Sequence, residues 1–207
     1  MAVMVENPEM TPILPEIHLA RHGETAWSRT GQHTGLTDLP LTERGERNAR
    51  DLAQRLAGVA VSGVLTSPLR RAADTARIAG FGATAVVDPD LVEWDYGDYE
   101  GLTTTEILAR RADWDLFRDG CPGGESPAEV GARADAVVRR LRAADASLLV
   151  FSSGHILRVL AARWLGLPPA AARHFLLGTA SLSTLGYEHT PAQPVLRLWN
   201  DVRHVSA

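Results

Sequence analysis

The chain of 207 residues contains no lysine, because all 21 of its basic residues are arginine. This absence excludes a lysine Schiff base and a phosphate-binding loop of the Walker type, since both need a lysine side chain. Any phosphate that the protein binds is therefore held by arginine. The arginines are scattered along the chain and the formal net charge is -4, so we expect neither a nucleic acid nor a membrane surface as a partner.

Cysteine and long apolar runs are scarce as well. Cys121 is the single cysteine, which excludes an intramolecular disulfide framework, and no cysteine and histidine residues have zinc-ligand spacing. The most apolar stretch, residues 156–172, is interrupted by Arg158, Arg163 and two prolines, which makes it unsuited to span a bilayer. Residues 1–16 lack a basic region and a sustained apolar run, so we expect a loose leader and not a signal peptide. These features predict a cytoplasmic protein without a bound metal.

Apolar strands and amphipathic helices alternate along the remainder of the chain. Strands are predicted at residues 17–20, 61–67, 83–91 and 147–153, and two closing strands, possibly antiparallel in pairing, at 181–188 and 194–200. Helices are predicted at residues 43–58, 68–80, 103–120, 127–145 and 155–166, the fourth of them capped by Ser126. This alternation predicts one domain over residues 17–207, an α/β sandwich around a mostly parallel sheet.

Polar side chains gather directly after the predicted strands. These positions are Arg21 and His22, residues 67–71, Glu93 and residues 152–155, and ligand sites of such sheets lie at the carboxyl ends of strands. Arginine binds phosphoryl oxygens, histidine can act as nucleophile, base or acid, and a buried glutamate can donate a proton. The residues therefore favour a phosphate-handling site, although an arginine and histidine in a solvated turn, and a glutamate paired with an arginine, remain open alternatives.

Several sequence blocks resemble those of the histidine phosphatase superfamily, in the same order and over about residues 17–204. They are "LARHGETAW", "GQHTGLTDLPLTERG", "TSPLRRAADTA", "LVEWDYGDYEGLT", "CPGGES" and "LLVFSSGHILR". The resemblance implies the phosphoglycerate mutase-like fold, which is a three-layer α/β/α sandwich, with a small helical cap at about residues 103–126. It implies no cofactor and no metal.

The resemblance also assigns roles to individual residues. It makes His22 the nucleophile that becomes phosphohistidine, with Arg21 and Arg71 binding the transferred phosphoryl group and Glu93 donating the proton. Arg71 is chosen because the family's arginine directly precedes the alanine of "RA", which leaves Arg70 peripheral. Substrate-binding positions near the phosphate are Ser28, Thr34 and Gly154.

Ser153 departs from the family pattern. The resemblance places a second catalytic histidine here, in contact with the phosphoryl group, and we do not take His155, two residues further, as its shifted replacement. Serine is shorter and neutral, and the loss of one such donor commonly slows an enzyme ~10²- to 10³-fold. We therefore predict a site that binds phosphate and turns over slowly. An engineered substitution, a natural weakening that leaves a binding module, and an adaptation to other chemistry are the three explanations.

The length of the inserted segment bears on the reaction. Residues 103–146 form a shorter insertion than is typical of mutases, which favours hydrolysis because water can reach the phosphohistidine. Two blocks resemble a subgroup of acid phosphatases and sugar bisphosphatases. We expect a metal-independent phosphatase of phosphorylated small molecules; the alternatives are a catalytically silent binding protein and a mutase-type phosphotransferase, and a homodimer is left open. Candidates to line the mouth of the site are His33, Arg110, Arg111 and Trp114.

Overall fold

The computed structural model describes residues 14–205, so most of the leader predicted at residues 1–16 lies outside the described part. Six strands form one sheet in the order β3-β2-β4-β1-β5-β6. Their bounds are β1 Ile17–Arg21, β2 Gly63–Thr66, β3 Ala85–Val87, β4 Leu148–Ser152, β5 Leu182–Tyr187 and β6 Pro194–Asp201. The first four strands pair in parallel, whereas β5 and β6 join antiparallel. The predicted α/β class with a mostly parallel sheet is confirmed.

The register of the central strands places the ends of β1 and β4 side by side. Arg21, the last residue of β1, pairs with Ser152, the last residue of β4. The backbone N–H of His22 then donates to the carbonyl oxygen of Ser152 at 2.9 Å. The two loops that leave these strands, beginning with His22 and Ser153, therefore start next to each other.

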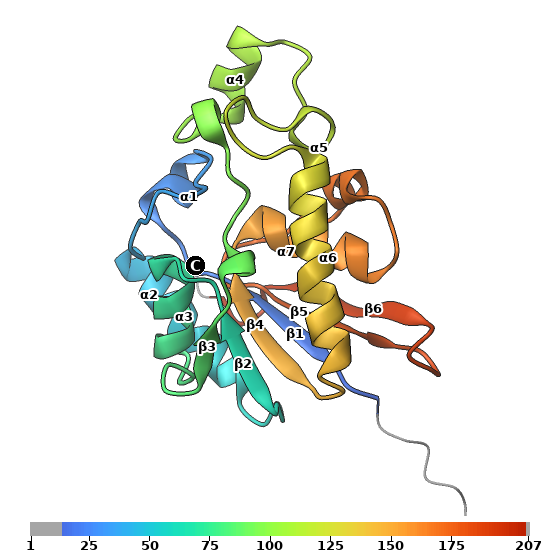
Figure 1. Ribbon diagram of the computed structural model, residues 1–207. Helices are drawn as coiled ribbons and strands as arrows, with labels where there is room; N and C mark the ends of the chain where they lie inside the picture. The colour runs from blue at the N-terminus through green and yellow to red at the C-terminus, as the bar shows by residue number, and fades with distance from the viewer. Residues whose placement is uncertain (1–13, 206–207) are drawn as a thin grey trace, which may run out of the picture.

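Helices cover both faces of the sheet (Figure 1). Helices α2 (Glu43–Leu56) and α3 (Arg70–Ile78) lie on one face, and α6 (Pro127–Ala143) and α7 (Gly154–Trp164) lie on the other. Ser126 caps α6 as predicted, because its side chain accepts from the backbone N–H of Glu129 while the Glu129 side chain accepts from Ser126. This reciprocal arrangement satisfies donors that a helix start would otherwise leave unpaired.

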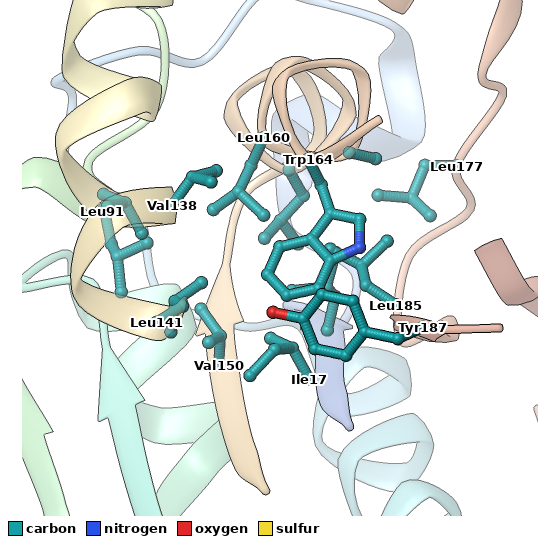
Figure 2. Close-up of a cluster of buried hydrophobic side chains, with 14 residues drawn as sticks. Ile17, Leu91, Val138, Leu141, Val150, Leu160, Trp164, Leu177, Leu185 and Tyr187 are labelled. Carbon is teal, nitrogen blue, oxygen red and sulfur yellow. The ribbon is translucent and has the colours of Figure 1, made fainter. Parts of the chain in front are cut away.

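One core cluster of buried hydrophobic side chains lies between the sheet and helices α6 and α7 (Figure 2). Trp164 of α7 is fully buried, and its ring centroid lies 5.1 Å from that of Tyr187 on β5. The indole N–H donates to the carbonyl oxygen of Gly186 at 3.1 Å, so this large side chain is buried without an unpaired polar atom. The packing fixes α7, whose first turn contributes to the edge of the sheet where ligand sites are expected.

The segment predicted as one helix at residues 103–120 is two short helices, and that prediction was wrong. Helix α4 (Thr104–Arg110) ends before a turn, and α5 (Leu116–Asp119) begins after it. The reason is local: the side chain of Asp115 accepts from the backbone N–H groups of Phe117 and Arg118, which starts a new helix at that point. Figure 1 shows both helices beyond the carboxyl ends of the parallel strands.

Two further elements differ from the prediction. Residues 83–91 form only the short strand β3, because Asp88 caps a 3₁₀ turn at Pro89–Leu91. Helix α1 (Ala26–Thr30) was not predicted, and its start is fixed by a capping box between Thr25 and Ser28. Turns of 3₁₀ type also occur at Gly97–Tyr99 and Pro169–His174.

Over residues 14–205, no helix has the length and apolar composition that crossing a membrane requires.

Candidate active site

A cavity of about 260 Å³ opens at the carboxyl ends of β1 and β4. It is lined by six of the eight predicted site residues, namely Arg21, His22, Ser28, Thr34, Glu93 and Gly154, together with Gly31, Gln32, His33, Tyr96, Thr104, His155, Arg158 and Leu177. Arg71 and Ser153 are fully buried and are not among the lining residues. A larger cavity of about 680 Å³ lies at the opposite ends of the strands and contains none of the predicted site residues.

His22 follows β1 and is 4% exposed. Its Nδ1 lies 2.8 Å from the carbonyl oxygen of Gly23. A carbonyl only accepts hydrogen bonds, so Nδ1 carries the ring hydrogen and Nε2 keeps its lone pair. Burial, followed by the charges of Arg71 and Arg21, holds the pKa of His22 well below its usual range. The imidazole is therefore neutral and available as a nucleophile at neutral pH.

Two glycines allow the loop after β1 to pack tightly against the start of α2. A Cβ atom on Gly23 would overlap the carbonyl oxygen of Gly45, and a Cβ atom on Gly45 would overlap the backbone of Glu24. The backbone N–H of Thr42 donates to the carbonyl oxygen of Glu24 at 2.9 Å. The close approach brings the loop that begins with His22 onto a helix that is itself packed on the sheet.

Arg21 lines the cavity and has one buried donor that is unpaired within the described residues. Its Nη1 donates to the carbonyl oxygen of Leu177 at 2.5 Å, while its buried Nε has no hydrogen-bond partner within residues 14–205. Burial lowers the pKa of Arg21, but a guanidinium remains charged in proteins. Gly154 leaves room for this side chain, since a Cβ atom there would lie 3.2 Å from the guanidinium carbon. The charged guanidinium at the cavity wall suits a phosphoryl group.

Arg71 is directed at a loop and not into the cavity. It donates to the carbonyl oxygens of Thr37 at 3.0 Å, Thr34 at 3.0 Å and Gly35 at 2.8 Å. Its Nε donates to the Ser153 hydroxyl oxygen at 3.2 Å. In this arrangement Arg71 supports the wall formed by residues 34–37, and it must exchange some of these partners to reach a bound phosphoryl group. Arg70, which was expected to be peripheral, is exposed and paired with Asp74.

Glu93 joins the loop after β3 to the first turn of α7. Its carboxylate accepts from the backbone N–H groups of Trp94 at 2.9 Å, His155 at 2.9 Å and Ile156 at 2.8 Å. The residue is 4% exposed and still lines the cavity. These three bonds hold the carboxylate in a fixed position at the cavity wall.

Tyr96 and His155 form a pair in the cavity wall to which the sequence had assigned no role. The Tyr96 hydroxyl lies 2.5 Å from Nδ1 of His155. Burial, then the nearby Glu93, raises the pKa of Tyr96 well above its usual value, and burial lowers that of His155 well below its own. Tyr96 therefore donates to Nδ1 of a neutral His155, whose Nε2 then carries a hydrogen. In the sequence, only their proximity to predicted site residues indicates that they belong to the site: Tyr96 follows Glu93 by three residues and His155 follows Ser153 by two.

His33 and Arg158 complete the outer part of the cavity. Burial lowers the pKa of His33 from 6.5 to about 4, and its ring packs 4.8 Å from Tyr96 and 5.7 Å from Trp114. Arg158 lies over the Phe117 ring at 4.6 Å, and its spacing after Gly154 puts both on one face of α7. Of the four candidates for the mouth, His33 lines the cavity and Trp114 packs behind it; Arg110 and Arg111 are not among the lining residues.

In the described chain, no group of three or more histidine, cysteine, aspartate or glutamate side chains is placed to bind a metal.

The chain is similar to known phosphatases. It is 43% identical over 175 residues to an acid phosphatase of Mycobacterium tuberculosis, covering 83% of this chain and 86% of that protein. It is 37% identical over 192 residues to a sedoheptulose 1,7-bisphosphatase of Saccharomyces cerevisiae, covering 76% and 70%.

Similar folds and a family profile agree with these relatives. The solved structure of an open reading frame product from Mycobacterium tuberculosis has a TM-score of 0.85 and 40% identity, covering 90% of this chain and 97% of that one. The profile of branch 1 of the histidine phosphatase superfamily matches residues 17–202. The resemblance inferred from the sequence blocks is confirmed, and the chain belongs to branch 1 of the histidine phosphatase superfamily.

Proposed function

We propose that the protein hydrolyses phosphomonoesters of small molecules through a phosphohistidine on His22. The observation that carries this proposal is the state of His22, a buried neutral imidazole whose Nδ1 is fixed by the Gly23 carbonyl and whose ring faces a cavity shared with Arg21 and Glu93. An unprotonated ring nitrogen beside a permanent cation is the arrangement that phosphoryl transfer to histidine needs.

The reaction takes place in two steps. In the first, Nε2 of His22 attacks phosphorus, the bond to the ester oxygen breaks, and protonated Glu93 gives its proton to the leaving alkoxide. In the second, the Glu93 carboxylate removes a proton from water, the water oxygen attacks phosphorus, and the nitrogen–phosphorus bond breaks to release phosphate. Arg21 binds the phosphoryl oxygens in both steps through its guanidinium and offsets their charge. Arg71 joins it when its guanidinium leaves the carbonyls of residues 34–37.

The names of the relatives and the cavity walls support a small, hydroxylated substrate. The similar proteins are an acid phosphatase and a sugar bisphosphatase. Neutral hydrogen-bonding side chains line the outer cavity, and they are Gln32, His33, Thr104 and His155. Such groups suit the hydroxyls of a sugar phosphate better than an apolar leaving group. The single domain at residues 17–207, the cap at about 103–126, the cytoplasmic location and a homodimer stay predictions.

Ser153 supports a reduced rate and a second candidate function. Its hydroxyl oxygen is bonded to Arg71, and it cannot present the charge of an imidazolium to a phosphoryl group. With Arg71 also bonded to three backbone carbonyls, the same site could hold a phosphorylated ligand without cleaving it. A catalytically silent binding protein is therefore the alternative that these contacts favour.

The test is phosphate release from an aryl phosphate and from a sugar phosphate in the presence of a chelator, combined with trapping of the phosphoenzyme in an alkaline quench that preserves phosphohistidine. We expect the native chain to release phosphate and form a phosphoenzyme, and His22→Ala to lose both. His189→Ala, at a histidine whose side chain is 74% exposed, should match the native chain. A phosphoenzyme that persists in His22→Ala removes His22 from its role. Ligand binding without turnover indicates the binding protein, and isomerisation of phosphoglycerate, added as a third substrate, indicates the mutase.

A further inference from the structure

Helix α3 contacts the nucleophile's loop through a second buried residue, one turn after Arg71. Thr75 is fully buried, and its hydroxyl donates to the carbonyl oxygen of Arg71 at 2.7 Å. The hydroxyl oxygen of Thr75 also accepts from the backbone N–H of Gly23 at 3.1 Å. The Gly23 carbonyl in turn accepts from Nδ1 of His22. Hydrogen bonds at the N–H and at the carbonyl of Gly23, joined by the backbone of this residue, therefore connect α3 with the imidazole.

The loop after β1 needs a hydrogen bond from outside because it contains Gly23. Only glycine fits at position 23, since a Cβ atom would overlap the carbonyl oxygen of Gly45. Glycine restricts its own backbone dihedrals less than any other residue, so the peptide groups on either side of it are not held by local sterics. The hydroxyl of Thr75 fixes the first of these peptide groups from outside the loop.

The contact between Thr75 and Gly23 requires a hydroxyl group. A threonine that bonds only to the carbonyl four residues earlier is an ordinary feature of helices. Here the oxygen must donate to Arg71 and accept from Gly23 at once, which serine and threonine can do and an apolar side chain of the same shape cannot. The contact to Gly23 is thus additional to what the helix itself requires.

We propose that Thr75 is a positioning residue for the nucleophile: by holding the backbone N–H of Gly23, it places this residue so that the Gly23 carbonyl, in the following peptide group, binds Nδ1–H of His22 and leaves the Nε2 lone pair directed at the cavity. Its effect on catalysis rests on the proposed function, whereas its effect on the tautomer of His22 is a property of the free protein. The two can therefore be tested separately.

The first measurement is ¹⁵N NMR of the histidine rings in the full chain, with His22 assigned from the signals lost in His22→Gln. The native chain and Thr75→Ser should show His22 protonated at Nδ1 alone. Thr75→Val, which keeps the shape and removes the hydroxyl, should show both tautomers in exchange. Thr66→Val is the matched control, because Thr66 is also buried and its hydroxyl donates only to the carbonyl of Ser67. It should leave the His22 signals unchanged.

The second measurement is the rate of phosphoenzyme formation in a single turnover of an aryl phosphate. A small displacement of a reacting group can cost up to about 10²-fold, so we expect Thr75→Val to slow this step ~10- to 100-fold with KM changed less than ~3-fold. Thr75→Ser should recover most of the rate, and Thr66→Val should retain it. Thermal unfolding identifies variants that do not fold. If Thr75→Val does not fold, Thr75→Ala takes its place, because it removes the same hydroxyl.

The outcomes separate the two proposals. An unchanged tautomer and rate in folded Thr75→Val or Thr75→Ala overturns the role of Thr75, as does an equal loss in Thr66→Val. A native chain that forms no phosphoenzyme, while the hydroxyl deletion still alters the His22 tautomer, overturns the proposed function and leaves the positioning role standing.

Discussion

The replacement of Ser153 by histidine or alanine tests how the site holds its arginine. Ser153 is fully buried, and its hydroxyl oxygen accepts from Nε of Arg71 at 3.2 Å. Alanine removes this acceptor and adds nothing. Histidine removes it and adds a ring N–H beside the phosphoryl position. The two variants therefore separate the tether to Arg71 from the missing imidazole.

The magnitudes predict which effect dominates. A preorganised donor to the transition state contributes about 3 to 4 kcal/mol, or ~10²- to 10³-fold in rate. A hydrogen bond to a charged group contributes about 1.5 to 3 kcal/mol, and a separation of 3.2 Å lies at the long end of the usual range, so we take about 1.5 kcal/mol for the bond to Arg71. The difference predicts a gain of about 10- to 100-fold for Ser153→His and a loss of about 10-fold for Ser153→Ala.

The assay is kcat/KM for an aryl phosphate and for a sugar phosphate, in chelator, at one pH near neutrality. Thermal unfolding of each variant shows that the comparison is between folded proteins. A folded Ser153→His variant with activity equal to or below that of the native chain would refute the reasoning and make Ser153 part of this enzyme's own chemistry. If the native chain, Ser153→His and Ser153→Ala all bind phosphate but are inactive, the result indicates a catalytically silent binding protein.

Two further predictions concern His33 and Glu93. The pKa of His33 is lowered from 6.5 to about 4, so below pH 6.5 the unfolded chain binds a proton that the folded chain does not, and stability falls as the pH falls. Between pH 7 and pH 4 the native chain should lose about 3 kcal/mol more than His33→Asn in urea unfolding; parallel losses would contradict this. Glu93→Gln should slow release from an alkyl phosphate ~10²-fold or more, and from p-nitrophenyl phosphate less than ~10-fold, because only the poor leaving group needs a proton. Equal losses in steady-state assays would exclude proton donation by Glu93.

The sequence predicted the parts of the site that depend on single strand ends. His22 follows β1 directly, and the pairing of Arg21 with Ser152 brings it next to the start of α7. This follows from alternating strands and helices alone, because parallel strands end at the same edge of the sheet. Glu93 reached the cavity for the same reason, although the last step ran through a 3₁₀ turn and not through a longer strand.

The remaining features depend on contacts between segments distant in sequence, which a pattern does not contain. The orientation of Arg71 is set by the carbonyls of residues 34–37, and no property of the "RA" block specifies those partners. The pair of Tyr96 and His155 joins positions 59 residues apart. The break at residues 111–115 was local, but it arose because the capping of Asp115 overcame the helical pattern on both sides.

The environment of His22 connects the stability of the fold with its chemistry. Burial and the charges of Arg71 and Arg21 oppose protonation of the ring, and only the Gly23 carbonyl favours it. The result is a histidine that stays neutral near two cations, where an exposed histidine at pH 6 would be partly protonated. The same burial acts on His155 and His33, whose pKa values are also lowered. Acid therefore destabilises the folded state through the very residues that line the cavity, and unfolding, more than protonation of His22, should limit activity at low pH.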